Sequence, residues 1–385
     1  MLRRIIRTGR SCHQLRWMDR VLSKKGKRSV DLGGARRFLC LQMNAIGDAV
    51  MAQPAWSAIG KAFPDAAIDL ACSPHIAPLF ENDPALHRIH RLRKSRYRPW
   101  LFEDGSSVRE TLRGARYDVI VDFSALPLTA NLCAQEEMPF SVGFQRRMEG
   151  WRGGLDLGRA YDGTTPYSEE VHCRALMLQL ANVICNLDDP EPAPKIYTDD
   201  ASLRKASAVL ESLGLREGSF ITIHPGAKWS PKIWPAGHWQ TLIRKLRDDM
   251  DASLFLLGGV QDRKIMDEIL HEGSMAGVPR YVSDDIMLSA ALIRLSALCL
   301  CHDSAPMHMA AALGVRSVAL FGPVLPSRSA PPQSEGCRAL HREMFCSPCT
   351  LYYAGERCRR GMNFCMHALG PDEVFRAVWD ALAFP

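Results

Sequence analysis

The feature that most constrains this chain is an alternation of short apolar runs with segments of helical period. The run at 38–43 ends in a turn with Gly47, and apolar residues then recur with helical spacing from 49 to 63. Further apolar runs at 67–72 and 117–122 are typical of strands. Strands that alternate with helices favour a parallel sheet covered on both faces, so the first half predicts a doubly wound α/β domain.

The same alternation starts again in the second half, with strand-like runs at 220–224, 253–257, 297–301 and 315–321. The stretch 186–194 between the halves, NLDDPEPAP, is polar and proline-rich, as expected of a linker. Because single cores stop growing at roughly 250 to 300 residues, a chain of 385 residues is expected to form two domains. We therefore expect a basic tail at 1–36, domains at 37–190 and 191–370, and a C-terminal helix at 371–385.

Positive charge is concentrated at the amino end. The net charge is +6, yet residues 1–37 alone have a balance of +10, which leaves about −4 for the rest. This basic tail could lie on anionic lipid as an amphipathic helix, could be solvated and disordered, or could be an organellar transit peptide. No apolar run reaches the roughly 18 residues that span a bilayer. We expect a cytoplasmic protein that could associate peripherally with the inner face of the inner membrane.

Thirteen cysteines with irregular spacing argue against a secreted disulfide scaffold. Four of them, Cys346, Cys349, Cys358 and Cys365, form a C-x2-C-x8-C-x6-C cluster. Four thiolates could hold a structural Zn²⁺, although the second pair lacks the usual C-x2-4-C spacing. Buried reduced thiols or a local disulfide are the alternatives.

In open α/β sheets, ligands bind beyond the carboxyl ends of the strands, so the loops there hold the candidate site residues. Asp48 follows the first strand near a helix N-terminus, where it is either a cap or a general base toward a ligand hydroxyl. The loop at 224–235 offers the components of an anion site, although exposed lysines are usually only solvated. Its candidate residues are His224, Gly226, Lys228 and Lys232.

A third loop places Asp303, Ser304 and His308 at a strand end and in the helix that follows. We expect Ser304 to cap that helix, with the free amides facing the crevice. The alternative is a capped, well-packed helix with a core histidine. The sequence contains no G-x-G-x-x-G, P-loop, G-x-S-x-G or H-E-x-x-H motif, so the corresponding enzyme classes have no direct support.

Taken in order, these loops resemble glycosyltransferase family 9, the ADP-heptose:lipopolysaccharide heptosyltransferases. The resemblance extends from about Phe38 to Leu382. In the first half it is carried by the turn ending in Gly47-Asp48, the Pro54-Ala55 helix and residues 63–70. In the second half it is carried by the H-P-G-x4-K-x-W-P type loop at 224–235, residues 303–313 and 321–323, the Cys-x-Pro-Cys at 346–349 and Cys365-Met366. Three positions depart from the family pattern. Gln42 replaces Arg, Asn44 replaces a small or hydroxyl residue, and Ala305 replaces Gly. Alanine can take the place of that glycine only if the backbone φ angle there is negative.

The resemblance implies a GT-B fold, with two Rossmann-like doubly wound domains facing across a cleft. It implies a metal-independent, inverting transfer of a sugar, a heptose or a hexose, from a nucleotide diphosphate donor, expected to be an ADP-sugar, to a lipopolysaccharide-type or other lipid-linked glycan acceptor. No cofactor and no specific nucleic acid partner is implied. Asp48 would deprotonate the acceptor and Lys232 would neutralise the departing diphosphate. The donor-binding residues would be His224, Gly226, Lys228, Asp262, Asp303, Ser304 and His308.

Two other function classes stay open at this point. A sugar-nucleotide epimerase shares the GT-B architecture but needs no acceptor. A non-catalytic protein that binds membranes or nucleic acid through its basic tail would show salt-dependent binding.

Overall fold

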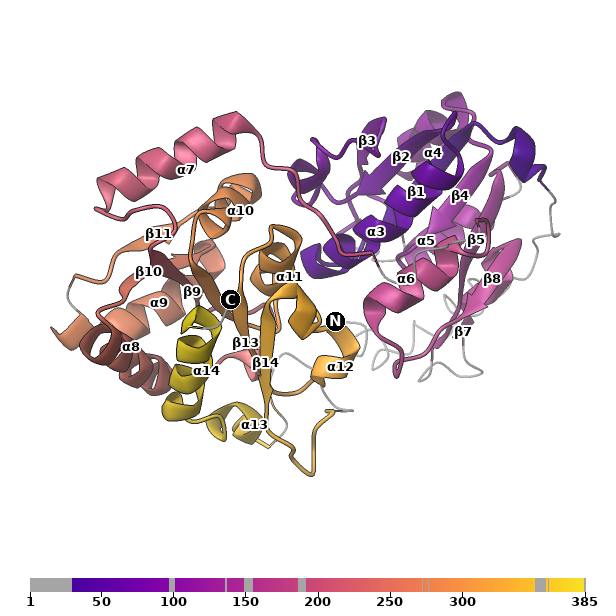
Figure 1. The fold of residues 1–385 in the computed structure, drawn as a ribbon. Coiled ribbons are helices and arrows are strands. Elements are labelled where there is room, and N and C mark those ends of the chain that lie inside the picture. Colours follow the sequence, from indigo (N-terminus) through magenta and orange to yellow (C-terminus); the bar gives the residue numbers. More distant parts are fainter. Residues whose placement is uncertain are drawn as a thin grey trace. The chain divides into compact units, whose positions relative to one another are not determined.

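The computed structural model describes residues 30–96, 101–135, 137–148, 155–185, 192–271, 273–275, 277–349, 358 and 360–383. The chain divides into two compact units, Met1–Pro194 and Lys195–Pro385 (Figure 1). The division falls at the end of the predicted linker, four residues after the expected boundary. Residues 1–29 of the basic tail and 186–191 of the linker lie outside the described residues.

The first unit is built on a parallel sheet of six strands in the order β3-β2-β1-β4-β5-β8. The strands are β1 Arg37–Gln42, β2 Ala67–Cys72, β3 Arg88–Arg91, β4 Val119–Asp122, β5 Phe140–Gln145 and β8 Gly163–Pro166. Its helices are α3 Ile46–Ala62, α4 Gly105–Gly114, α5 Pro127–Cys133 and α6 Cys173–Ala181. A small antiparallel pair, β6 Arg147–Met148 and β7 Leu155–Asp156, follows β5.

The second unit repeats the design with the order β11-β10-β9-β12-β13-β14. The strands are β9 Phe220–His224, β10 Ser253–Gly258, β11 Arg280–Val282, β12 Leu298–His302, β13 Ser317–Phe321 and β14 Cys337–His341. The helices are α7 Asp200–Ser212, α8 Ala236–Met250, α9 Arg263–Leu270, α10 Ile286–Arg294, α11 Ala305–Ala312, α12 Pro326–Ser329, α13 Phe364–His367 and α14 Pro371–Ala383. The short 3₁₀ turns η4 Ser230–Lys232 and η5 Val260–Asp262 follow β9 and β10. The predicted α/β class with two doubly wound domains is confirmed.

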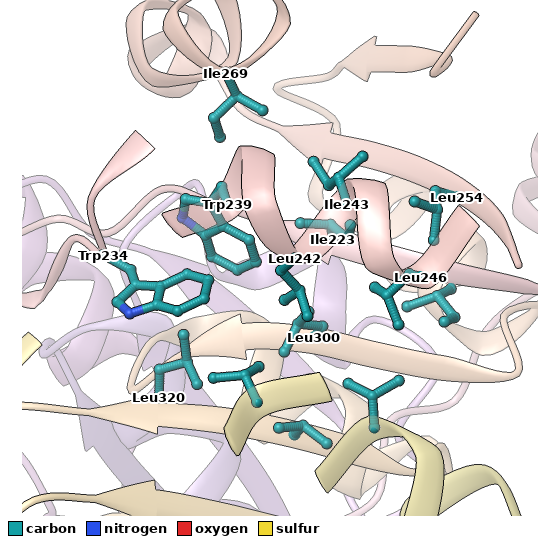
Figure 2. Close-up of a cluster of buried hydrophobic side chains, with 14 of the residues drawn as sticks. Ile223, Trp234, Trp239, Leu242, Ile243, Leu246, Leu254, Ile269, Leu300 and Leu320 are labelled. Carbon is teal, nitrogen blue, oxygen red and sulfur yellow. The ribbon is translucent and has the colours of Figure 1, made fainter. Parts of the chain in front are cut away.

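Helix α8 covers one face of the second sheet, and the core there contains Trp239 of the helix and Trp234 of the loop before it (Figure 2). Trp234 and Trp239 are fully buried, and their rings meet edge to face with centroids 4.9 Å apart. Trp234 also donates its indole N–H to the carbonyl of Leu369, at 2.9 Å. Burial of a large apolar side chain stabilises a fold by roughly 1.5 to 3 kcal/mol. This packing therefore anchors the chain just after Lys232.

Helix α14 belongs to the same core. Its buried residues, Val374, Ala377, Val378 and Ala381, lie in the cluster that includes the strands and α8. The helix begins at Pro371, as predicted, and carries Asp372 and Glu373 in its first turn. Helix α14 is therefore an integral part of the second unit.

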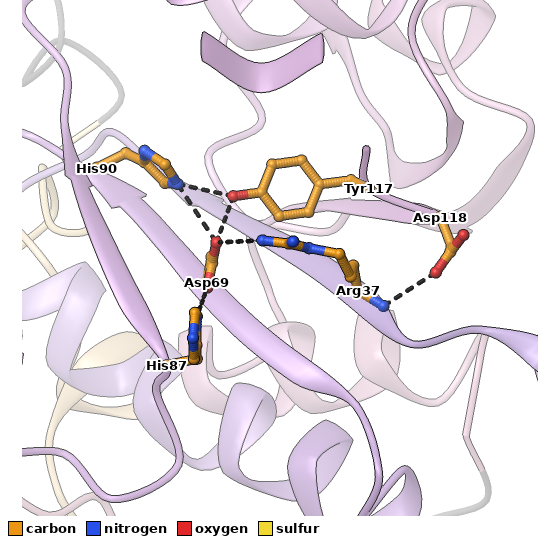
Figure 3. Close-up of polar contacts among 6 residues, drawn as sticks. All are labelled: Arg37, Asp69, His87, His90, Tyr117 and Asp118. Carbon is orange, nitrogen blue, oxygen red and sulfur yellow. Dashed lines mark hydrogen bonds and ion pairs between the residues drawn. The ribbon is translucent and has the colours of Figure 1, made fainter. Parts of the chain in front are cut away.

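A polar network crosses the first sheet around the buried Asp69 on β2 (Figure 3). Its carboxylate accepts a 2.5 Å hydrogen bond from the Tyr117 hydroxyl and contacts rings of His87 at 3.0 Å and His90 at 3.4 Å. The guanidinium of Arg37 lies 3.9 Å away. Arg37 opens β1 and Tyr117 precedes β4, so the network lies toward the amino ends of these strands, away from the ligand edge.

The same network changes the acidity of Asp69. Burial by itself would raise the pKa of this carboxyl, but hydrogen bonds with His90, Tyr117 and His87 outweigh burial and lower the pKa from 3.8 to about 2.

No helix among the residues described in either unit is both long and apolar enough to cross a bilayer.

The lowered pKa of Asp69 predicts a loss of stability in acid. A carboxyl with a depressed pKa in the folded state stabilises the fold above its unfolded pKa, and this contribution disappears as pH falls toward about 2. Urea unfolding between pH 5 and pH 2 should show a loss of about 2 kcal/mol that is absent in Asp69→Asn. Equal pH slopes in the two proteins would contradict the assignment.

Candidate active site

The candidate site of the second unit lies where its strand order reverses, between β9 and β12. These two strands are parallel neighbours, and His224, the last residue of β9, is the register partner of Cys301 on β12. The loops that follow them therefore leave the sheet side by side. In doubly wound sheets this switch point is where ligands bind.

The closest charged pair at this edge joins the two loops. The Lys232 ammonium lies 2.6 Å from a carboxylate oxygen of Asp303 and donates to the Asp303 carbonyl at 3.0 Å. The two side chains are 14% and 7% exposed, so water screens the pair only weakly. Asp303 is held in turn by the hydroxyl of Ser329, at 3.3 Å. The structure thus places Lys232 and Asp303 together, although 70 residues separate them in sequence.

A buried histidine fixes both ends of the loop that carries Lys232. His302, the last residue of β12, accepts a hydrogen bond at Nε2 from the backbone N–H of Trp234, at 3.0 Å. Its Nδ1 lies 3.2 Å from the carbonyl of Gly226 and must therefore carry the proton and donate. Burial lowers the pKa of His302 to about 3, so the ring is neutral and can both donate and accept.

Glycine is required at position 226 because the loop passes close to Asp262, in the turn that follows β10. A Cβ at this position would lie 1.9 Å from a carboxylate oxygen of Asp262. That carboxylate is buried, accepts from the Gly259 N–H at 2.9 Å, and lies 3.5 Å from Nε2 of His224. His224, Gly226 and Asp262 are thus brought together, and Asp262 holds the protein's own loops at this edge.

The start of α11 differs from the sequence prediction in one respect. Ser304 occupies the N-cap position, but its hydroxyl donates to the His302 carbonyl at 3.2 Å and makes no capping bond. The prediction of a side-chain cap was therefore wrong: the hydroxyl donates back to β12, and its oxygen accepts no N–H of the helix. Ala305 is the first helical residue and is not among the positive-φ residues, so alanine fits there. His308 is buried within the helix.

Lys228 and the cysteine cluster are the remaining predicted features. Lys228 is exposed on the loop surface. Cys346, Cys349 and Cys358 are half-buried free thiols and Cys365 is a buried one. In the described part of the chain, no three His, Cys, Asp or Glu side chains gather as a metal site would require. A structural zinc site at the four cysteines stays a prediction that this arrangement of the thiols does not support.

In the first unit, Asp48 lies at the ligand edge, in the first turn of α3. One carboxylate oxygen accepts from the N–H of Ala45, the N-cap residue, at 3.1 Å. This contact starts α3 at Ile46, three residues earlier than predicted. Asp48 is the third helical residue and not the cap itself. The carboxylate is half-buried at the end of β1, a place from which it can accept a proton from a bound hydroxyl.

The turn before Asp48 is held by its neighbours on β1 and β4. Gln42 accepts from the Asn44 N–H at 3.1 Å, and the Asn44 side chain donates to the Ser124 carbonyl at 2.9 Å. The Ser124 hydroxyl accepts from the Met43 N–H at 2.9 Å. Two of the three departures from the family pattern, Gln42 and Asn44, therefore fix the shape of the Asp48 turn.

A buried carboxyl, that of Asp122, holds Ser124 in place through a hydrogen bond. Asp122, at the end of β4, accepts from the Ser124 N–H at 2.9 Å and from the Tyr161 hydroxyl at 2.6 Å. Burial raises the pKa of Asp122, and these hydrogen bonds partly oppose the rise. The Tyr161 ring occupies the space that a Cβ on Gly143 would fill, at 2.4 Å, so glycine is needed there.

Sequence reasoning missed the supporting residues of both halves, chiefly His302, Ser329, Ser124 and Asp122. His302 stood within a motif that was recognised, and its position at the end of a fully apolar strand was the one available signal. The others act through contacts between distant parts of the chain. No local pattern marks them.

His302 yields a test of the loop architecture. His302→Leu should lower the free energy of unfolding by about 2 to 4 kcal/mol, because two backbone groups lose their buried partner. A neutral histidine also makes stability fall as pH drops from 6.5 toward about 3, since only the unfolded chain takes up the proton. Chemical denaturation of the variant should lack that slope, while His271→Ala, at an exposed position, should match the wild type. An unchanged slope in His302→Leu would rule out the neutral bridge.

Comparison with known proteins agrees with this geometry. The model of glycosyltransferase family 9 (heptosyltransferase) matches residues 106–354. Lipopolysaccharide heptosyltransferase 2 of Escherichia coli (strain K12) is 26% identical over 314 residues, which cover 79% of this chain and 87% of that protein.

Solved structures show the same fold. The family 9 glycosyl transferase from Veillonella parvula aligns with a TM-score of 0.76 at 17% identity, covering 94% of this chain and 100% of that one. ADP-heptose lps heptosyltransferase II of Escherichia coli aligns with a TM-score of 0.70 at 21% identity, covering 90% and 98%. The predicted GT-B class is thereby confirmed. Because the family model covers more than half of the chain, this protein belongs to glycosyltransferase family 9 and is a glycosyltransferase.

Proposed function

We propose that this protein transfers heptose from ADP-heptose to the core of a lipopolysaccharide, with inversion at the anomeric carbon. The relatives named above are lipopolysaccharide heptosyltransferases, and one solved relative is described as an ADP-heptose enzyme. The observation that carries the proposal is the Lys232–Asp303 pair at the switch point between β9 and β12. It supplies a positive group where a nucleotide diphosphate would lie.

On the donor side, Lys232 offsets the charge that develops on the diphosphate as the sugar leaves. Asp303 and the loop fixed by His302 hold the ammonium in place before the reaction, so little reorganisation is needed in the transition state. The first amides of α11 add partial positive charge beside it. His224, Gly226 and Asp262 shape the floor of this donor site, and Ser304 and His308 its far side. Lys228 reaches the donor from the loop surface.

On the acceptor side, Asp48 takes the proton from the acceptor hydroxyl. The hydroxyl oxygen then attacks the anomeric carbon as the bond to the diphosphate oxygen breaks, and the bonding electron pair leaves with ADP. Attack from the face opposite the leaving group inverts the anomeric configuration. No metal enters this scheme, because Lys232 and the helix amides supply the charge that a divalent cation would supply elsewhere.

Membership of the family favours transfer over epimerisation, the second enzyme class that the sequence left open. Membrane association through the basic tail stays a prediction, because residues 1–29 are outside the described part of the chain.

Asp48→Asn tests the acceptor half. Asparagine still offers an oxygen to the Ala45 N–H, so α3 should start normally, but it cannot take a proton. Turnover of ADP-heptose with a heptose-deficient lipopolysaccharide should fall by about 10² to 10⁴-fold. The thermal shift caused by ADP should be unchanged, and Asp65→Asn, an exposed carboxyl at the opposite end of α3, should keep full activity. Retained turnover in Asp48→Asn would remove it from this role.

Lys232→Met tests the donor half. The variant removes the charge and leaves an unbranched side chain one atom shorter, so kcat should fall by about 10² to 10³-fold. Lys205→Met, on the exposed surface of α7, is the matched control and should retain wild-type kcat. Wild-type turnover should persist in excess EDTA. A normal kcat in Lys232→Met would contradict the leaving-group role, and loss of activity in EDTA would contradict metal independence.

A further inference from the structure

One side chain outside all the loops discussed so far contacts the turn that carries Lys232. The amide of Asn363 donates to the carbonyl of Pro231 at 3.1 Å and to the carbonyl of Ile233 at 2.8 Å. These are the residues directly before and after Lys232. Carbonyl oxygens only accept, so the NH₂ of the amide, with its two donors, must face them.

Asn363 makes these contacts in place of its usual local role. It is the N-cap residue of α13, a position where asparagine commonly bonds to its own helix. Here the side chain makes no capping bond and reaches across to a segment 130 residues earlier in the chain. The side chain is therefore committed to the Lys232 turn.

The segment that bears Asn363 is firmly seated. Cys365 and Met366 are buried, and Met366 lies against Gly322, where a Cβ would come within 2.4 Å of its sulfur. The Leu369 carbonyl accepts from the Trp234 indole at 2.9 Å, which ties the same segment to the loop a second time. Asn363 thus projects from a fixed support onto the turn.

The turn itself is closed by backbone bonds. Within and around η4, Lys232 donates its N–H to Trp229 and Ile233 donates its N–H to Ser230, at 2.9 and 3.1 Å. Pro231 has no N–H to contribute. A turn of this length gains much of its definition from outside, and Asn363 fixes carbonyls on both sides of the lysine.

We infer that Asn363 is a positioning residue for the transfer reaction, holding the Lys232 ammonium where the departing diphosphate develops charge. This inference rests on the proposed role of Lys232. Asn363 acts through Lys232, so its loss should lower kcat with little change in donor KM, because the contact it supports strengthens in the transition state.

The test is a double-mutant cycle between Asn363 and Lys232, measured as ADP released from ADP-heptose in the presence of a heptose-deficient lipopolysaccharide. Asn363→Ala should lower kcat by about 10- to 100-fold, as expected for a misplaced catalytic group. Asn363→Ser, which keeps one donor, should fall between Asn363→Ala and the wild type. In the Lys232→Met background, Asn363→Ala should cause no further loss. Met362→Ala, on the exposed neighbour, is the matched control and should retain full activity.

The outcomes separate the two claims. If Lys232→Met loses activity but Asn363→Ala keeps wild-type kcat, or if Asn363→Ala lowers kcat equally in both backgrounds, positioning by Asn363 is overturned and the proposed function stands. If Lys232→Met itself keeps full kcat, the leaving-group role falls and the inference falls with it. An additive loss accompanied by a lower unfolding temperature would show that Asn363 only stabilises the fold.

Discussion

The candidate donor site of the second unit depends on one neutral histidine. His302 ends β12 and closes both ends of the loop after β9, accepting from Trp234 and donating to Gly226. Only an uncharged ring can do both, and burial keeps the ring uncharged. Between these two points the loop turns outward and presents Lys232 to Asp303. The ion pair is therefore carried by a loop whose two ends both bond to one buried ring.

The acceptor half solves the same problem with different groups. There the loop after β1 is held by Ser124, and Ser124 is held by the buried Asp122. In each unit, a polar residue at or just after the end of the fourth strand thus bonds to the loop that follows the first strand. The topology explains this correspondence, because these two strands are neighbours at the switch point of each sheet.

The sequence was informative where a strand is a continuous apolar run. Most central strands were predictable for this reason, but the buried strand β5 contains Ser141 and Gly143, and the edge strands β3, β8, β11 and β14 carry polar or charged residues, so their sequences lack that signal. The chemistry-bearing loops were predictable from their place after strands. Their partners were not: the Lys232–Asp303 contact and the Asn363 clamp join segments far apart in the chain. Local geometry also matters, since the Ser304 hydroxyl donates back to β12 and caps no N–H of the helix that it precedes.

The central claim is that the crevice at Lys232 and Asp303 receives the donor diphosphate. A crystal structure of the protein with ADP tests this most directly. The account predicts the diphosphate within hydrogen-bonding reach of the Lys232 ammonium, about 2.7 to 3.2 Å, beside the start of α11. A diphosphate bound elsewhere, with Lys232 distant from every phosphate oxygen, would contradict it.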